Sequence, residues 1–94
     1  MNKEEFKVQA KQTIDEVTEK ISELETKKES AEENSKAKYE EALKDLKAKK
    51  TDLESKYSDV ENAAEDKMEE AKEAFSSASD SFKDGLSKIS SLFS

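Results

Sequence analysis

The side chains in this sequence that are most able to do chemistry are carboxylates, and Glu69, Glu70 and Glu73 form one of their closest groups. Paired carboxylates catalyse acid–base reactions when burial splits their pKa values, so that one group keeps its proton while the other loses it. The surrounding segment is predicted to be helical and highly charged, and a helical hairpin offers no enclosed pocket that could bury these groups. We therefore predict that they are solvated, with at most an unspecific attraction for divalent cations.

Other residue types that usually carry catalysis are missing. The chain has no histidine and no cysteine, which removes the commonest general base, the commonest zinc ligands and the usual soft nucleophile. Its serines have no base to activate them, and neither a glycine-rich phosphate loop nor a calcium-binding loop is present. We predict that the protein is not an enzyme, with no catalytic residues, no cofactor, no metal site and no small-molecule substrate.

Composition indicates one small helical domain over residues 1–94. Charged residues make up 44% and hydrophobic residues 32% of the chain, so only a narrow apolar stripe can be buried. Proline is absent and glycine occurs once, which favours helices because turns and sheets usually need both. The net charge of −7, with lysines interleaved among acids, argues against nucleic acid as a partner. Neither a secretory signal nor a membrane-spanning stretch is visible, so the expected location is the cytoplasm or the periphery of a membrane.

Apolar residues recur with helical spacing along almost the whole chain. Steps of four and three residues, the heptad spacing of a coiled coil, connect Ala10, Ile14, Val17, Ile21 and Leu24. The same spacing resumes further along the chain and continues to its end, and no segment alternates with a period of two. The predicted fold class is therefore all-α.

Only weak sequence features indicate where the chain reverses direction. Residues Ser58 to Glu61 resemble a capping box, which often begins a helix. Folding the chain back at Ser58 also places large side chains opposite small ones, for example Leu46 opposite Ala71, and such pairs fill space well.

Two arrangements follow from these signals. The first is a long antiparallel helical hairpin, or coiled coil, with a first helix over 3–57, a turn near residue 58 and a second helix over 59–93. The alternative is a three-helix bundle with an additional break near residues 32–36, where apolar residues are sparse.

In the hairpin, the N-terminal half of the first helix would project without a partner, so we predict self-association. An exposed apolar seam normally finds another chain. The residues predicted to form this seam are Ile14, Val17, Ile21, Leu24, Leu43, Leu46 and Leu53. This makes the leading hypothesis a structural or interaction protein that forms homo-oligomers or pairs with other coiled-coil helices.

Several residues along the chain match a known pattern: Ala37, Tyr39, Glu40, Glu41, Leu43, Leu46, Ala48 and Lys49, followed later by Phe82, Lys83, Asp84 and Gly85. In these positions the sequence resembles small, poorly characterised bacterial coiled-coil proteins of the stress-response type, although it lacks the tryptophans common in their last helix. The resemblance implies a helical hairpin with a stress-associated role and no catalytic residues. Residues 63–73 are more loosely similar to desiccation-protection proteins and to exchangeable apolipoprotein helices.

The C-terminal segment differs from the rest. Eight of residues 76–94 are serine and only four are charged. The apolar residues at helical spacing here, which form a candidate lipid-binding or partner-binding face, are Phe75, Phe82, Leu86, Ile89, Leu92 and Phe93. A bulky apolar face opposite a serine-rich face is typical of helices that insert into loosely packed lipid. The second hypothesis is therefore a membrane-surface or lipid-binding protein acting through residues 75–94.

The same face could instead pack inside the protein or against another subunit. A third hypothesis is a partly disordered stress protectant.

Overall fold

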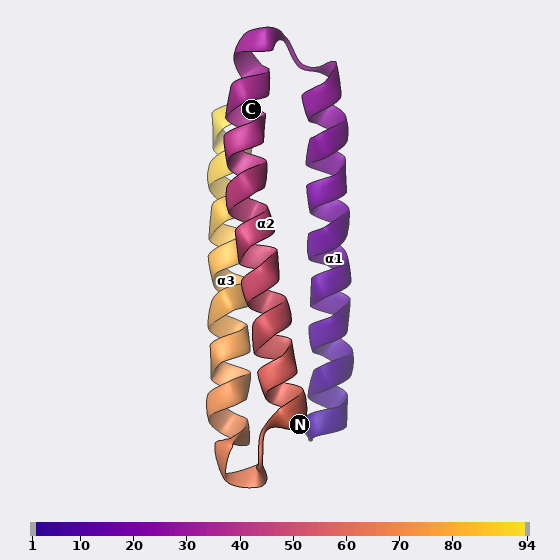
Figure 1. Cartoon of the computed structure of the whole chain (residues 1–94), viewed down its shortest axis with the longest axis vertical. Coiled ribbons are helices and arrows are strands. Elements are labelled where there is room, and N and C mark those ends of the chain that lie inside the picture. The colour runs from indigo at the N-terminus through magenta and orange to yellow at the C-terminus, as the bar shows by residue number, and fades with distance from the viewer. Residues whose placement is uncertain (1, 94) are drawn as a thin grey trace.

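The chain folds into a bundle of three helices, each antiparallel to the one before it. The computed structural model describes the backbone of residues 2–93 and the side chains of residues 2–91. Its elements, in chain order, are the α-helices α1 (Lys3–Ser30) and α2 (Glu33–Asn62), the 3-10 turn η1 (Glu65–Lys67) and the α-helix α3 (Met68–Phe93). The bundle extends 50 × 18 × 17 Å (Figure 1). Residues 2–93 contain no strand, so the all-α prediction is confirmed.

The chain reverses direction twice, which gives the three-helix bundle and not the hairpin. The first reversal occupies Ala31 and Glu32, at the margin of the break that the alternative arrangement placed at residues 32–36. Both residues have extended backbone angles, and the Ala31 N–H donates to the Lys28 carbonyl at 3.1 Å. The predicted single helix over 3–57 is therefore wrong, because folding back here covers the apolar stripe of α1 within the same chain.

The second reversal lies about one heptad later than predicted. It runs from Ala63 into η1, whereas Ser58 lies inside α2, so the predicted turn near residue 58 and the helix over 59–93 are wrong. The helix continues because Val60 is completely buried, and a turn at Ser58 would lose that burial. Burying one such side chain contributes about 1.5–3 kcal/mol.

The later turn also changes which residues of α2 and α3 face each other. Leu46 Cδ2 lies 3.5 Å from the position that a Cβ atom would take at Gly85. Ala71, the predicted neighbour of Leu46, lies 14 residues earlier on α3, which corresponds to roughly 21 Å along a helix. The predicted pairing is therefore wrong. Gly85 lies inside α3, where its lack of a side chain lets Leu46 and Lys49 of α2 approach closely.

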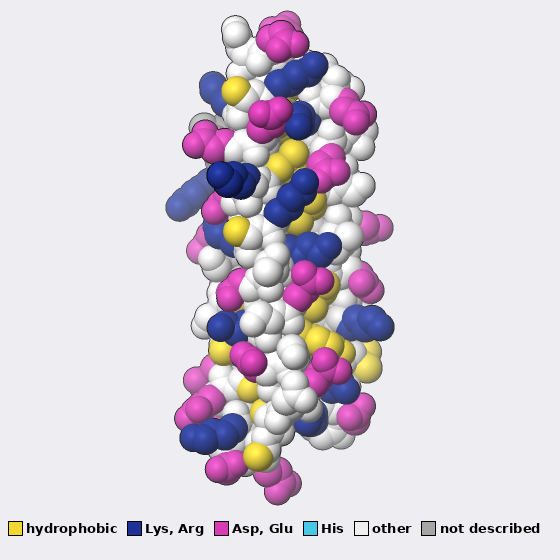
Figure 2. Space-filling view, in the orientation of Figure 1, with side chains coloured by type: hydrophobic (Ala, Val, Ile, Leu, Met, Phe, Trp, Pro, Cys, Tyr) yellow, Lys and Arg dark blue, Asp and Glu magenta, His cyan; other side chains and the backbone are white. Residues whose placement is uncertain are grey.

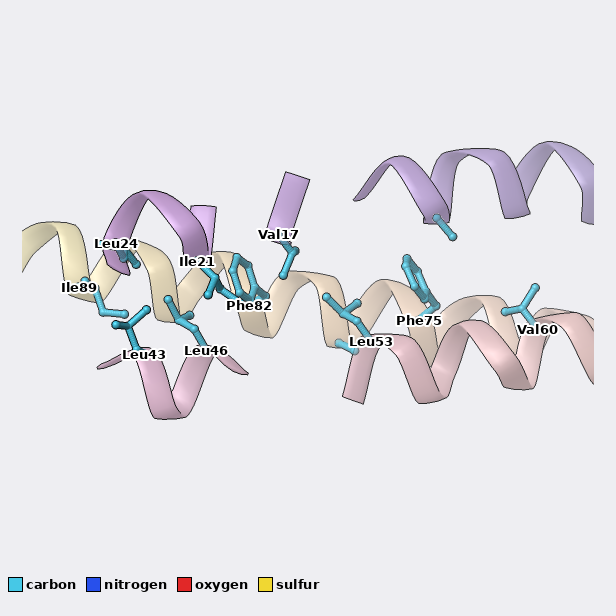
Figure 3. Close-up of a cluster of buried hydrophobic side chains, with 12 residues drawn as sticks. Val17, Ile21, Leu24, Leu43, Leu46, Leu53, Val60, Phe75, Phe82 and Ile89 are labelled. Atoms are coloured by element: carbon cyan, nitrogen blue, oxygen red, sulfur yellow. The ribbon is translucent and has the colours of Figure 1, made fainter. Parts of the chain in front are cut away.

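Each helix contributes one apolar stripe to a single core that runs the length of the bundle (Figure 3). The buried core residues are Ala10, Val17, Ile21, Leu24, Leu43, Leu46, Leu53, Val60, Phe75, Ala78, Phe82 and Ile89. The three that are buried most completely, Leu46, Leu53 and Val60, all belong to α2. This fits the position of α2, which packs along both neighbours while α1 and α3 touch each other less. Among residues 2–93, no helix is long and apolar enough to cross a membrane.

Candidate functional site

The seven residues predicted to form a seam between subunits lie together inside one chain. Six of them are buried in the core, and Ile14 is partly buried against it. They come from α1 and α2, which pack side by side in antiparallel orientation (Figure 1). The seam therefore has an intramolecular partner, and self-association stays a prediction that needs a further argument.

The candidate apolar face of α3 is also directed into the bundle. Phe75, Phe82 and Ile89 are buried and Leu86 is partly buried, as their helical spacing requires. Ala78, which lies between Phe75 and Phe82 at helical spacing, belongs to the same buried stripe. The side chains of Leu92 and Phe93 lie outside the described residues. Of the three helices, α3 is the most strongly amphipathic.

The outer face of α3 differs in chemistry from the outer faces of α1 and α2. Its exposed serines in the described part of the chain are Ser76, Ser77, Ser81, Ser87, Ser90 and Ser91. Over α1 and α2, in contrast, acidic and basic side chains are interleaved, and apolar side chains show mainly in the groove between the two helices (Figure 2). From residue 76 to residue 91, α3 thus combines a bulky buried face with an exposed face on which six serines outnumber four charged residues.

Ion pairs join α1 to α2. Lys47 Nζ lies 2.9 Å from Glu25 Oε1, and Lys28 Nζ lies 3.2 Å from Glu40 Oε1. The Lys47 ammonium lowers the pKa of Glu25, first through its hydrogen bond and then through its charge. These pairs lie at the surface, where water and salt screen them, so they add little to stability. Their value is in fixing the register of the two helices, because each lysine meets one carboxylate of the other helix.

The contacts that hold α3 are mainly apolar. Besides the core, the Phe75 ring meets Phe6 of α1 edge to face, with centroids 5.8 Å apart and planes at 82°. The Lys72 ammonium lies 5.8 Å from the centre of the Phe6 ring. Further along, a groove of about 110 Å³ between α1 and α3 is lined by Val17, Phe82 and other side chains, so this seam is incompletely filled.

The carboxylates considered for chemistry are solvated, as predicted. Glu69, Glu70 and Glu73 are all exposed on the first turns of α3. Lys72 Nζ lies 3.6 Å from Glu69 Oε1. Across the described residues, no group of three or more potential ligands is placed to hold a metal ion.

No protein-family model, curated protein or solved structure matches this chain. Fold and surface together define its class, which is a small three-helix bundle with one serine-faced amphipathic helix. The resemblance to bacterial stress-response coiled-coil proteins stays a prediction.

Proposed function

We propose that this protein is a non-enzymatic helical bundle that binds loosely packed lipid surfaces by turning out the apolar face of α3. One observation carries the proposal: over residues 75–91, α3 pairs a bulky buried face with a serine-rich outer face whose two acidic and two basic residues cancel in charge. A helix of this composition enters lipid through apolar burial and not through attraction to anionic head groups. It therefore selects membranes whose packing defects expose acyl chains.

The serines of α3 support this interpretation because the fold does not require them. Serine has a lower helix propensity than lysine or glutamate, by a few tenths of a kcal/mol at each position. The outer faces of α1 and α2 use charged residues at equivalent exposed positions, and these also form ion pairs within a helix, such as Lys49 with Asp45 at 3.0 Å. A surface selected for stability alone would have the same composition on α3.

Lipid can replace the contacts that α3 makes in the closed bundle. Moving Phe75, Phe82 and Ile89 out of the core removes about 1.5–3 kcal/mol of burial for each side chain. Insertion into the acyl region restores that burial, because it again removes the same apolar surface from water. Insertion does not rebury the sides of Leu46, Leu53 and Val60 that face α3 in the closed bundle. The closed form is therefore favoured in water, and a loosely packed membrane populates the open form by binding it selectively.

A disulfide that keeps the bundle closed tests this proposal. Thr13 of α1 and Ser79 of α3 line the same two grooves, and the chain has no cysteine of its own. Oxidation of Thr13→Cys/Ser79→Cys is expected to join α1 to α3, and thiol titration checks that the bond has formed. As the matched control, oxidation of Thr18→Cys/Thr51→Cys is expected to join α1 to α2 across a groove that both residues line, and to leave α3 free.

The measurement is flotation with small, strongly curved vesicles of unsaturated phosphatidylcholine. The reduced double variants and the oxidised α1–α2 control are expected to float like the parent protein, whereas the oxidised α1–α3 variant stays at the bottom of the gradient. Equal flotation of the oxidised α1–α3 variant would show that α3 does not need to leave the bundle. Failure of the parent protein to float would end the proposal.

A further inference from the structure

We infer that a second copy of this chain is a binding partner, and that two copies assemble by exchanging α1 through the connector at Ala31 and Glu32. In the exchanged dimer, α1 and α2 of each chain join into one continuous helix over residues 3–62. The α1 part of one copy then packs on α2 and α3 of the other. This inference rests on the connector and on the α1–α2 interface, so it is independent of lipid binding by α3.

Nothing in the local sequence enforces the reversal at this connector. It contains neither glycine nor proline, and among the described residues no backbone φ angle is positive. Ser30, Ala31, Glu32 and Glu33 are all compatible with a helix interior, and alanine and glutamate favour it. Glu32, which precedes α2, makes no capping hydrogen bond with its side chain. Two residues need to move from extended to helical angles to make the helix continuous.

A continuous helix would also satisfy backbone groups that the reversal leaves without helical partners. At a helix end, the last four carbonyls and the first four N–H groups lack their usual partners. In the closed bundle the Ser35 N–H donates to the Glu32 carbonyl at 2.9 Å and the Ala31 N–H donates to the Lys28 carbonyl at 3.1 Å, which covers part of this need. The remaining groups at the end of α1 and the start of α2 would pair in the exchanged form.

The apolar stripes of α1 and α2 stay in phase across the connector. Leu24, Lys28, Ala31, Ser35 and Tyr39 follow one another at steps of four, three, four and four residues. A continuous helix therefore presents both stripes on the same side, where an antiparallel second copy can cover them.

The contacts between α1 and α2 recur unchanged when α1 comes from another copy. The Lys28–Glu40 and Glu25–Lys47 pairs lie close to the connector and would form between chains with the same register. The closed monomer and the exchanged dimer thus share their interfaces and differ mainly at the connector. Because two chains form one dimer, the equilibrium between the two forms depends on protein concentration. The second reversal is the less suitable site because it involves five residues outside α-helix, Ala63 to Lys67.

Proline at the connector gives a sharp test. Glu32 has φ −68° and ψ 157°, and Ala31 before it has φ −80° and ψ 156°, so Glu32→Pro fits the closed bundle. Inside a continuous helix the same proline lowers the population of the exchanged form by a factor of about 100 or more at each connector. The matched control is Ala64→Pro in the second reversal, where φ is −72° and ψ is 161°.

The mass of the full chain is measured by light scattering over a series of concentrations, after refolding at high concentration. The parent protein and Ala64→Pro are expected to form dimers that dissociate slowly on dilution, and Glu32→Pro is expected to stay monomeric. A parent protein that is monomeric throughout, or a Glu32→Pro variant that dimerises as well as the parent, would overturn the inference. So would loss of the dimer in Ala64→Pro, since that would place the exchange at the other reversal.

Spin labels distinguish exchange from ordinary side-by-side pairing. Lys11→Cys and Asp59→Cys place two labels at exposed positions of α1 and α2 in the same chain. In the closed bundle these positions lie on adjacent helices, whose axes are typically about 8–10 Å apart. In a continuous helix they are separated by roughly 70 Å at 1.5 Å per residue. With labelled chains diluted into unlabelled ones, dimers that keep only the short distance would refute exchange.

Discussion

Truncation of Ile21 tests most directly whether the apolar seam is covered within one chain. Ile21 is 6% exposed in the bundle, whereas in a hairpin with one turn near residue 58 it would project without an intramolecular partner. Replacing a buried isoleucine with alanine costs about 2–5 kcal/mol. Ile21 also lines a surface groove between α1 and α2, so water can enter part of the space left behind. We therefore expect a cost near the lower end, about 2–3 kcal/mol for Ile21→Ala.

This cost is large relative to the stability of the whole domain. Natural domains have about 0.05–0.15 kcal/mol per residue, which gives roughly 5–14 kcal/mol for a chain of this length. The measurement is urea unfolding followed by the helical circular dichroism signal, with the slope of the transition checked against the parent protein. Val8→Ala is the matched control, because Val8 lies on the same helix and is 59% exposed. The control is expected to change the free energy of unfolding by no more than about 0.5 kcal/mol.

The experiment is done in dilute solution and in the Glu32→Pro background, so that exchange between chains does not contribute. The cost of Ile21→Ala should then be independent of protein concentration. A cost no larger than that of Val8→Ala would mean that Ile21 is exposed in the isolated chain, and the three-helix arrangement would be refuted.

Three further outcomes follow from individual contacts. Lys47→Gln should raise the pKa of Glu25, as seen in an NMR titration, because Lys47 holds that pKa below its ordinary value. Since the pKa of Glu25 is lowered by folding, the small stabilisation from this exposed pair should be present above the ordinary value and lost as the pH falls through the lowered one. Gly85→Ala should raise the melting temperature in calorimetry, because alanine gains up to about 1 kcal/mol of helix propensity and the flexible end of Lys49 can move away from the new methyl group. Phe6→Leu should lower the free energy of unfolding by about 0.5–1.5 kcal/mol in urea titrations, through loss of its edge-to-face contact with α3.

The helices and their buried faces could be predicted from sequence because heptad spacing is a local signal. Residues such as Val17, Leu53 and Phe82 stand at the expected steps and are buried. The first reversal, at Ala31 and Glu32, adjoins the break that the alternative arrangement placed at residues 32–36 from their sparse apolar residues. The second could not be located, because Ala63 is a good helix former and no glycine or proline marks that site. At both positions the helix ends because folding back buries more apolar surface than a continued helix would, and this tertiary effect outweighs the local helix propensity.

The error in the second turn has a specific cause in the repeat itself. Moving a turn by about one heptad, from Ser58 to Glu65, shifts the partner of every residue by two heptads. Such a shift again places apolar positions opposite apolar positions, so periodicity cannot distinguish the two registers. The pairing of large with small residues could not distinguish the two registers either, because both supply a small neighbour for Leu46: Ala71 in the predicted register and Gly85 in the observed one.

The kinds of contact around each helix determine what can replace them under the two proposals. α1 meets α2 through apolar residues and through charge pairs such as Lys28 with Glu40, and only a chain with the same charges at the same spacing reproduces both. α3 is held mainly by side chains such as Phe75 and Phe82, and any apolar environment can take over that burial. Lipid would leave the lysines and carboxylates between α1 and α2 without matched partners, whereas a second copy would restore them. For this reason we assign α1 to exchange between chains and α3 to exchange with lipid.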